Sequence, residues 1–118
     1  MIFQNSMATD RKNFSQEEIN EVWEKAIPQP KNNPDLFRKD YAGAWIRKDA
    51  YGEQSEYGWE IDHIKPLAID GSHDISNLEP LQWQNNRTKG DDFPNWNTSM
   101  SANDVHNTEM HRSWCIKN

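Results

Sequence analysis

Four polar residues in the middle of the chain have side chains suited to the hydrolysis of phosphodiester bonds: Asp62, His63, Asn77 and Asn86. Histidine is a natural base for this reaction, because its ordinary pKa of about 6.5 leaves the imidazole largely neutral at cellular pH. A hard cation such as Mg²⁺ takes oxygen ligands and keeps several waters, so one carboxylate and one amide oxygen can hold it. We therefore expect His63 to activate water, and Asp62 and Asn86 to bind one divalent cation.

These residues must be brought together by the elements that carry them. Residues 59–64 alternate in the manner of a strand that ends before Pro66, and residues 78–81 form a second short extended segment. Residues 82–89 favour a helix, with Gly90 as a suitable residue to end it. The predicted order is strand, loop, strand, helix.

The adjacency of Asp62 and His63 places a condition on the first strand. Neighbouring residues of a regular strand point to opposite faces, so both side chains can face one site only where the strand ends and the chain turns. Asn77 is expected to fix the following loop through side-chain hydrogen bonds to the backbone, which would hold His63 in a productive orientation.

Three segments in this order, residues 59–67, 77–81 and 86–91, resemble the HNH nuclease motif of the ββα-metal (His-Me finger) fold. The resemblance implies a metal-dependent endonuclease that hydrolyses DNA and leaves a 5′-phosphate. It implies one divalent cation, with Mg²⁺ expected and Mn²⁺, Ni²⁺ or Zn²⁺ as alternatives. His63 matches the first histidine of the motif, Asn77 the central asparagine, Asn86 the final His/Asn position, and Asp62 the metal-binding acid.

One departure from many relatives concerns cysteine. Those relatives bind a structural zinc through two Cys pairs, whereas Cys115 is the single cysteine here, as in small stand-alone bacterial and phage members. Gln82 and Asn85 stand where the helix-side pair is expected, and Ala42 stands near an upstream position. A structural Cys₄ zinc site is therefore excluded. Three tryptophans are expected to hold the core by packing instead: Trp45, Trp59 and Trp83.

An amphipathic helix is predicted near the N-terminus. Ser15 and Glu18 have the spacing of a capping box, apolar residues then recur at helical intervals, and Pro28 ends the pattern. We interpret this segment as an amphipathic helix that covers the hydrophobic core.

The predicted elements indicate an α+β protein with this N-terminal helix and long loops, and the resemblance implies that it is built on a ββα-metal core. Residues 1–13 are expected to form a flexible arm, and residues 14–118 a single HNH nuclease domain with its motif core at 59–91. From about Asp92 onward, the sequence is rich in Asn, Ser and Thr and gives only weak signals.

The acidic balance of the chain opposes a simple DNA-binding surface. The net charge is -6 and the pI is about 5.1, whereas nucleic-acid binders usually present a basic face. Lys65, Arg87 and Lys89 are candidates for contacts to flanking phosphates. Two alternatives remain open: a non-cleaving ββα module that binds a metal, nucleic acid or protein, and a nuclease subunit of a larger complex that supplies the basic surface.

Composition sets the expected location and partners. The hydrophobic share is 34% and the mean hydropathy is -1.12, and no apolar run approaches the roughly 20 residues that a membrane helix needs. No signal-peptide pattern opens the chain. We expect a cytoplasmic protein that acts on DNA without a membrane, and a homodimer or a protein partner is left open.

Several nearby polar residues have competing interpretations. Asn85, next to Asn86, is a rival metal ligand, and His73 in the predicted loop is a candidate for substrate binding. Arg38 and Asp40 are expected to form an ion pair that supports the site.

Overall fold

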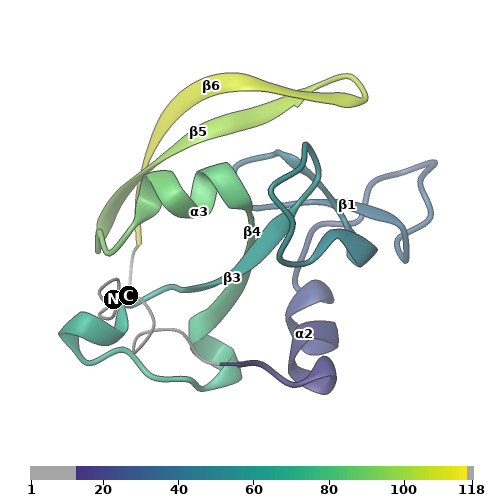
Figure 1. Ribbon diagram of the computed structural model, residues 1–118. Coiled ribbons are helices and arrows are strands. Elements are labelled where there is room, and N and C mark those ends of the chain that lie inside the picture. Colours follow the sequence, from purple (N-terminus) through teal and green to yellow (C-terminus); the bar gives the residue numbers. More distant parts are fainter. Residues whose placement is uncertain (1–12, 117–118) are drawn as a thin grey trace.

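The computed structural model describes residues 13–116, which form three antiparallel strand pairs and two helices (Figure 1). The predicted N-terminal arm, residues 1–13, lies outside this range except for Asn13. Within residues 13–116, no helix is long and apolar enough to cross a bilayer.

The first described helix, α2 (Gln16–Trp23), begins at the predicted capping box. Glu18 N donates to Ser15 Oγ at 3.1 Å, and Ser15 N donates to Glu18 Oε1 at 3.0 Å, so two backbone donors at the helix start are satisfied. The helix ends at Trp23, earlier than the predicted stop at Pro28. The hydrogen bonds after this point span three residues rather than four, which tightens the final turn.

Two short strands follow, β1 (Phe37–Lys39) and β2 (Trp45–Arg47), and pair antiparallel. The motif segment then supplies a second antiparallel pair, β3 (Trp59–His63) with β4 (Leu78–Gln82), and α3 (Trp83–Lys89) follows β4 directly. The chain is thus a small mixed α/β protein with short antiparallel strand pairs, which confirms the predicted class in its broad form.

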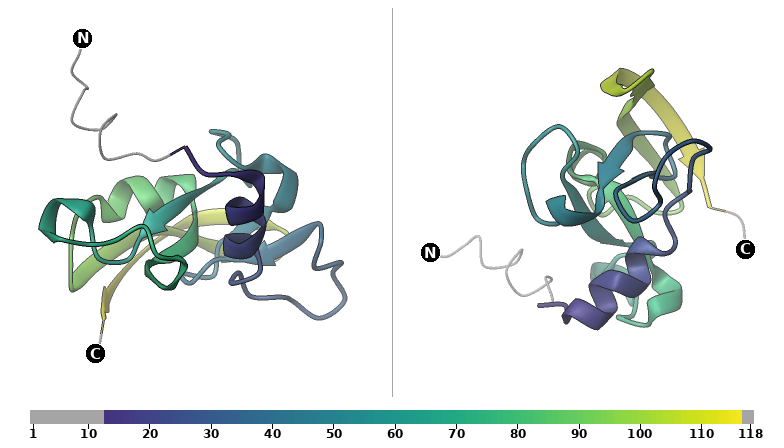
Figure 2. Two further views of the ribbon diagram at one scale, coloured as in Figure 1. Left: turned by 90° about the horizontal axis from the view of Figure 1, so that it is seen from below. Right: turned by 90° about the vertical axis from the view of Figure 1, so that its right-hand side faces the viewer.

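A long hairpin completes the described chain, formed by β5 (Asn95–Asn103) and β6 (His106–Cys115). Figures 1 and 2 show this hairpin lying across α3, which is placed between the hairpin and the β3–β4 pair. Sequence reasoning missed the hairpin because its inward positions include small polar residues, such as Thr98 and Ser101, which bury without a hydrophobic alternation.

The hydrophobic core lies where α2 packs against the β3–β4 pair. Trp23 and Trp59 are fully buried there, with ring centroids 5.5 Å apart. Of the tryptophans expected to hold the core, Trp45 and Trp59 are buried, whereas Trp83 is half-buried and donates its indole N–H to Ser55 O. Packing of aromatic rings therefore holds the core, with Trp23 in place of Trp83.

Candidate active site

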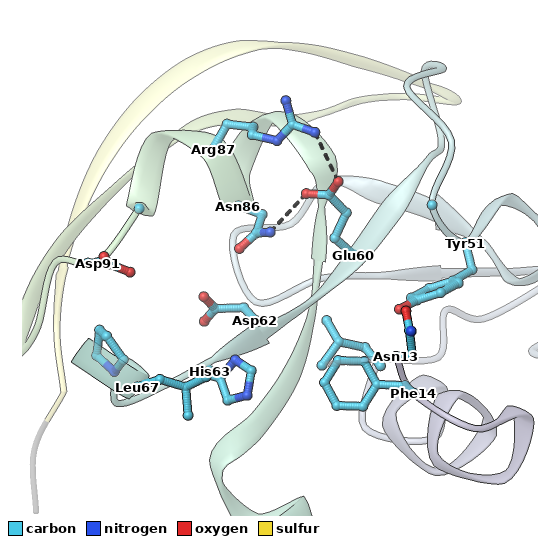
Figure 3. Close-up of a pocket in the computed structure, with 14 residues that line it drawn as sticks. Asn13, Phe14, Tyr51, Glu60, Asp62, His63, Leu67, Asn86, Arg87 and Asp91 are labelled. Atoms are coloured by element: carbon cyan, nitrogen blue, oxygen red, sulfur yellow. Dashed lines mark hydrogen bonds and ion pairs between the residues drawn. The ribbon is translucent and has the colours of Figure 1, made fainter. Parts of the chain in front are cut away.

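One pocket of about 640 Å³ brings together three of the predicted site residues, Asp62, His63 and Asn86 (Figure 3). Asp62 and His63 come from the end of β3, and Asn86 comes from the middle of α3. The side chains reach one space because α3 follows β4 at once and folds back over the strand pair. Residues distant in sequence are thereby placed around a single cavity.

The way in which β3 ends allows adjacent residues to face this pocket. His63 is the last residue of β3 and pairs with Leu78, the first residue of β4. The chain then leaves the ladder, and the bond from Ile64 N to Asn77 O at 2.8 Å is its next backbone contact with the start of β4. Asp62 is 5% exposed and His63 is half-buried, and both line the cavity. A strict strand alternation no longer applies at this position.

Asn77 does not line the pocket; it ties together the two ends of the loop that follows His63. Its Oδ1 accepts from Lys65 N at 2.8 Å, and its Nδ2 donates to Lys65 O at 3.0 Å and to Ser72 O at 2.8 Å. The amide thus satisfies three backbone groups of a segment without regular pairing. Asn77 is therefore a loop-fixing residue. The Lys65 side chain is exposed.

The orientation of Asn86 is set by a residue that sequence reasoning missed. Asn86 Nδ2 donates to Glu60 Oε1 at 2.8 Å, and the other oxygen of Glu60 accepts from Arg87 Nη2 at 3.1 Å. Figure 3 shows the amide oxygen of Asn86 turned instead toward Asp62 and Asp91. The alternation of the strand could have identified Glu60 as a site residue, because residues 60 and 62 lie on the same face of β3.

A second histidine also reaches the base candidate. His73 Nδ1 lies 3.0 Å from His63 Nε2, and the tautomers of the two rings decide which nitrogen donates. The two rings meet edge to face, with centroids 5.0 Å apart. His73 was considered for substrate binding; the structure places it against the imidazole of His63.

Lys89 is buried, which contradicts its predicted contact with phosphate. Its side chain is 0% exposed, and Nζ lies 3.2 Å from Asp62 Oδ1. The ammonium also donates to His63 O at 3.1 Å and to Ile64 O at 3.3 Å. Its three donors are matched by three acceptors, so none remains for a substrate phosphate. Arg87 is exposed, and its guanidinium contacts Glu60.

Two carboxyl groups meet behind the pocket. Burial raises the pKa of Asp62, with Lys89 and a hydrogen bond to Glu79 acting in the opposite direction. Burial, together with the hydrogen bond to Asp62 and its charge, raises the pKa of Glu79 to about 9. With this raised pKa, Glu79 is neutral at neutral pH. We assign the charge to Asp62 because only Asp62 hydrogen-bonds the Lys89 ammonium.

The positions that carry zinc-binding cysteines in many relatives hold a hydrogen-bond network around buried Asp40. Its Oδ1 accepts from the backbone of Ala42 and Ala44, at 3.0 and 2.9 Å. Its Oδ2 accepts from Gln82 N at 2.9 Å and from Asn85 Nδ2 at 3.0 Å. One carboxylate thus joins the segment before β2 to the start of α3.

This network also corrects two expectations. Arg38 pairs with Glu24 at 3.2 Å rather than with Asp40, because its guanidinium turns toward the end of α2. Asn85 is fully buried, and its Oδ1 accepts from the backbone N–H groups of Ser99 and Met100 in β5. It therefore holds the hairpin and is not available as a metal ligand.

The oxygen donors at the pocket fit a hard cation. Asp62 keeps lone pairs beyond those facing Lys89 and Glu79, since a carboxylate has about four acceptor positions. The Asn86 amide oxygen faces the same space, and Asp91 adds an exposed carboxylate to the lining. Within residues 13–116 there is no group of three or more His, Cys, Asp or Glu arranged to hold a metal. A cation here would therefore keep water or phosphate ligands, as Mg²⁺ commonly does.

Comparison with known proteins bears on this arrangement. A family model described as HNH endonuclease matches residues 48–92, a range that contains β3, β4, α3 and the four residues singled out from the sequence. No curated protein and no solved structure matches the chain. An HNH domain indicates nuclease activity on nucleic acid with a divalent metal. The match supports, over residues 48–92, the HNH endonuclease family that the motif resembled.

Proposed function

We propose that this chain is a metal-dependent endonuclease that hydrolyses the phosphodiester bonds of DNA. The observation that carries the proposal is the meeting of Asp62, His63 and Asn86 at one pocket. Their types supply a base and two oxygen ligands, and their matched positions in the HNH motif support the same roles. On this proposal, β3, β4 and α3 form the ββα-metal core of one domain spanning residues 14–118.

Each residue has a distinct part in the reaction. His63 accepts a proton from water, and the water oxygen attacks phosphorus in line with the departing 3′ oxygen. The bond between phosphorus and that oxygen breaks, and the departing oxygen takes a proton from solvent, which leaves a 5′-phosphate and a 3′-hydroxyl. Asp62 and Asn86 hold the cation, and Asn77 keeps the loop after His63 in place. When bound, the divalent cation, expected to be Mg²⁺, acts as a Lewis acid on the scissile phosphate.

Exposed basic side chains border the proposed site. Lys65 and Arg87 are exposed and can contact flanking phosphates, although Arg87 must share its guanidinium with Glu60. This basic surface is small, in keeping with the net charge of -6. A homodimer or a protein partner would extend it.

The test is a plasmid-nicking assay with Mg²⁺ or Mn²⁺. His63→Ala is expected to lower the rate by roughly 10²- to 10⁴-fold, the usual contribution of a general base. His111→Ala is the matched control, because His111 is exposed on β6 and lies outside the pocket. Undiminished nicking by His63→Ala would show that another group is the base.

Calorimetry separates the ligands from the base. Asn86→Ala is expected to weaken binding of the divalent cation, because it removes one of the two oxygen ligands assigned to the chain. His63→Ala is expected to leave cation binding close to that of the unaltered protein. Equal loss in both variants would contradict this division of roles.

A second candidate is a non-cleaving HNH domain that binds nucleic acid. The observation that favours it is the ion pair of Asp62 with buried Lys89, which neutralises part of the charge that a cation would otherwise meet. Gel shifts distinguish the two: cation-dependent binding of DNA without any cleavage, under conditions that keep the protein folded, would favour the binding module.

A further inference from the structure

Acidic side chains at the pocket differ in whether a basic side chain neutralises them. Glu60 accepts from Arg87 Nη2 at 3.1 Å, and Asp62 Oδ1 lies 3.2 Å from Lys89 Nζ. Asp91 also lines the pocket, is exposed, and forms no ion pair within the described part of the chain. Its carboxylate is therefore a negative charge that no described basic side chain neutralises.

The end of α3 directs Asp91 toward the pocket. The helix ends at Lys89, whose side chain is fully buried, so the last turn is anchored in the fold. The chain then turns at Gly90, which has a positive φ of 55°, a conformation that glycine adopts at little cost. Figure 3 shows the Asp91 carboxylate on the side of the cavity that also holds the Asn86 amide oxygen and the Asp62 carboxylate.

Electrostatics also indicate that the two aspartates lie near each other. Burial is the main cause of the raised pKa of Asp62, and the negative charge of Asp91 acts in the same direction. Like charges have this effect only at short range in a partly buried site. A cation between the two carboxylates would relieve their mutual repulsion.

The charge offered by Asp62 and Asn86 alone is small for a divalent cation. The ammonium of Lys89 pairs with Asp62, so these two groups together are close to neutral, and the amide of Asn86 carries no charge. Hard cations take carboxylate oxygens, and the number of charged ligands tunes their affinity. Asp91 supplies both a further oxygen and the missing negative charge.

We propose that Asp91 is a third protein ligand of the divalent cation, beside Asp62 and Asn86. This inference rests on the proposed nuclease function, which assigns a cation to the pocket. Two carboxylates and one amide oxygen leave octahedral positions for water and for a substrate phosphate oxygen. Because one donor is an amide, the set agrees with the absence, within residues 13–116, of three or more His, Cys, Asp or Glu arranged to hold a metal.

Calorimetry with Mn²⁺ tests this assignment without any need for cleavage. Asp91→Asn is expected to weaken Mn²⁺ binding at least about tenfold, a loss that even changes outside the ligand set commonly cause. Asp92→Asn is the matched control, because Asp92 is the next residue, is exposed and lies outside the pocket. Undiminished binding by Asp91→Asn, or an equal loss in both variants, would overturn the proposal.

Luminescence of bound Tb³⁺ distinguishes a ligand from a nearby charge. Tb³⁺ is a hard cation that takes oxygen ligands, and its emission lifetimes in H₂O and D₂O report how many waters it binds. Asp91→Ala is expected to add at least about one water to the bound ion, because water takes the vacated position. Asp92→Ala should add none. An unchanged water number in Asp91→Ala would show that Asp91 does not ligate the ion, which would contradict the assignment.

This inference and the proposed nuclease function fail in distinguishable ways. Nicking that depends on His63, together with undiminished Mn²⁺ binding by Asp91→Asn, would leave the nuclease standing and remove Asp91 from the ligands. Weakened binding by Asp91→Asn, with no cleavage by the unaltered protein, would keep the ligand and remove the nuclease. If the unaltered protein binds no Mn²⁺, the inference is wrong whatever its nicking activity.

Discussion

Lys89 Nζ lies 3.2 Å from Asp62 Oδ1, with the lysine side chain 0% and the aspartate side chain 5% exposed. The same ammonium does not donate to water, because its other two N–H groups donate to the carbonyl oxygens of His63 and Ile64. The last residue of α3 is thereby fastened to the end of β3. This single contact fixes both the proposed metal-binding acid and the backbone of the proposed base.

Replacing Lys89 tests this attachment. Lys89→Met keeps the length of the side chain but leaves Asp62 buried without its counter-ion, which typically costs about 3–5 kcal/mol of unfolding free energy. We expect that loss in urea denaturation. Lys65→Met, at an exposed lysine, is the control. Unchanged stability in Lys89→Met would show that the buried pair contributes little.

Glu79 makes stability depend on pH in a definite direction. Its pKa is raised from 4.5 to about 9 in the folded protein, so between these values the folded state holds a proton that the unfolded state has lost. Stability must therefore fall as the pH rises through this range. Glu79→Gln removes this titration, so we expect its melting temperature to decline less between pH 6 and pH 8 than that of the unaltered protein.

The measurement is thermal unfolding in the presence of a chelator, so that cation binding does not contribute. Glu53→Gln, at an exposed residue, controls for the change in net charge. Parallel pH profiles for Glu79→Gln and the unaltered protein would contradict a neutral Glu79.

Asp40 is expected to be a strong polar determinant of stability outside the pocket. Asp40→Asn has one acceptor oxygen in place of two and faces donors with its own N–H₂ group. Four donors depend on the native carboxylate, so at least about 2 kcal/mol of unfolding free energy should be lost. Asp49→Asn, at an exposed acid, should change little.

His73 is expected to affect catalysis without affecting stability. The residue is exposed, so His73→Ala should unfold at the same denaturant concentration as the unaltered protein. Loss of its hydrogen bond to His63 Nε2 should slow nicking by about tenfold, the effect of one lost hydrogen bond, and less than His63→Ala. His106→Ala, at an exposed histidine paired with Glu56, is the control. A nicking rate equal to that of the unaltered protein would remove His73 from the site.

Local sequence signals predicted the elements that carry the site. The capping box at Ser15, the alternation that becomes β3 and the glycine at position 90 all act over a few residues, so they can be read without coordinates. The HNH motif then named three residues that the structure places at the pocket, Asp62, His63 and Asn86. The end of α2 at Trp23 was predicted less well, because a packed turn continues its apolar pattern.

Tertiary contacts decided what the motif could not specify. Lys89 and Arg87 are close together in sequence and both basic, yet one is buried against Asp62 and the other is exposed. Likewise, Asn85 binds the hairpin while neighbouring Asn86 faces the pocket.

The sequence by itself determined the order of strand, strand and helix and the chemical types available at the site. Only the folded structure decided which of those types face solvent, the pocket or one another. The physical reason is that the partner of a buried polar group lies far along the chain, as Asp62 does for Lys89. Such a group is stable only where that partner satisfies it, and no short-range pattern records the pairing.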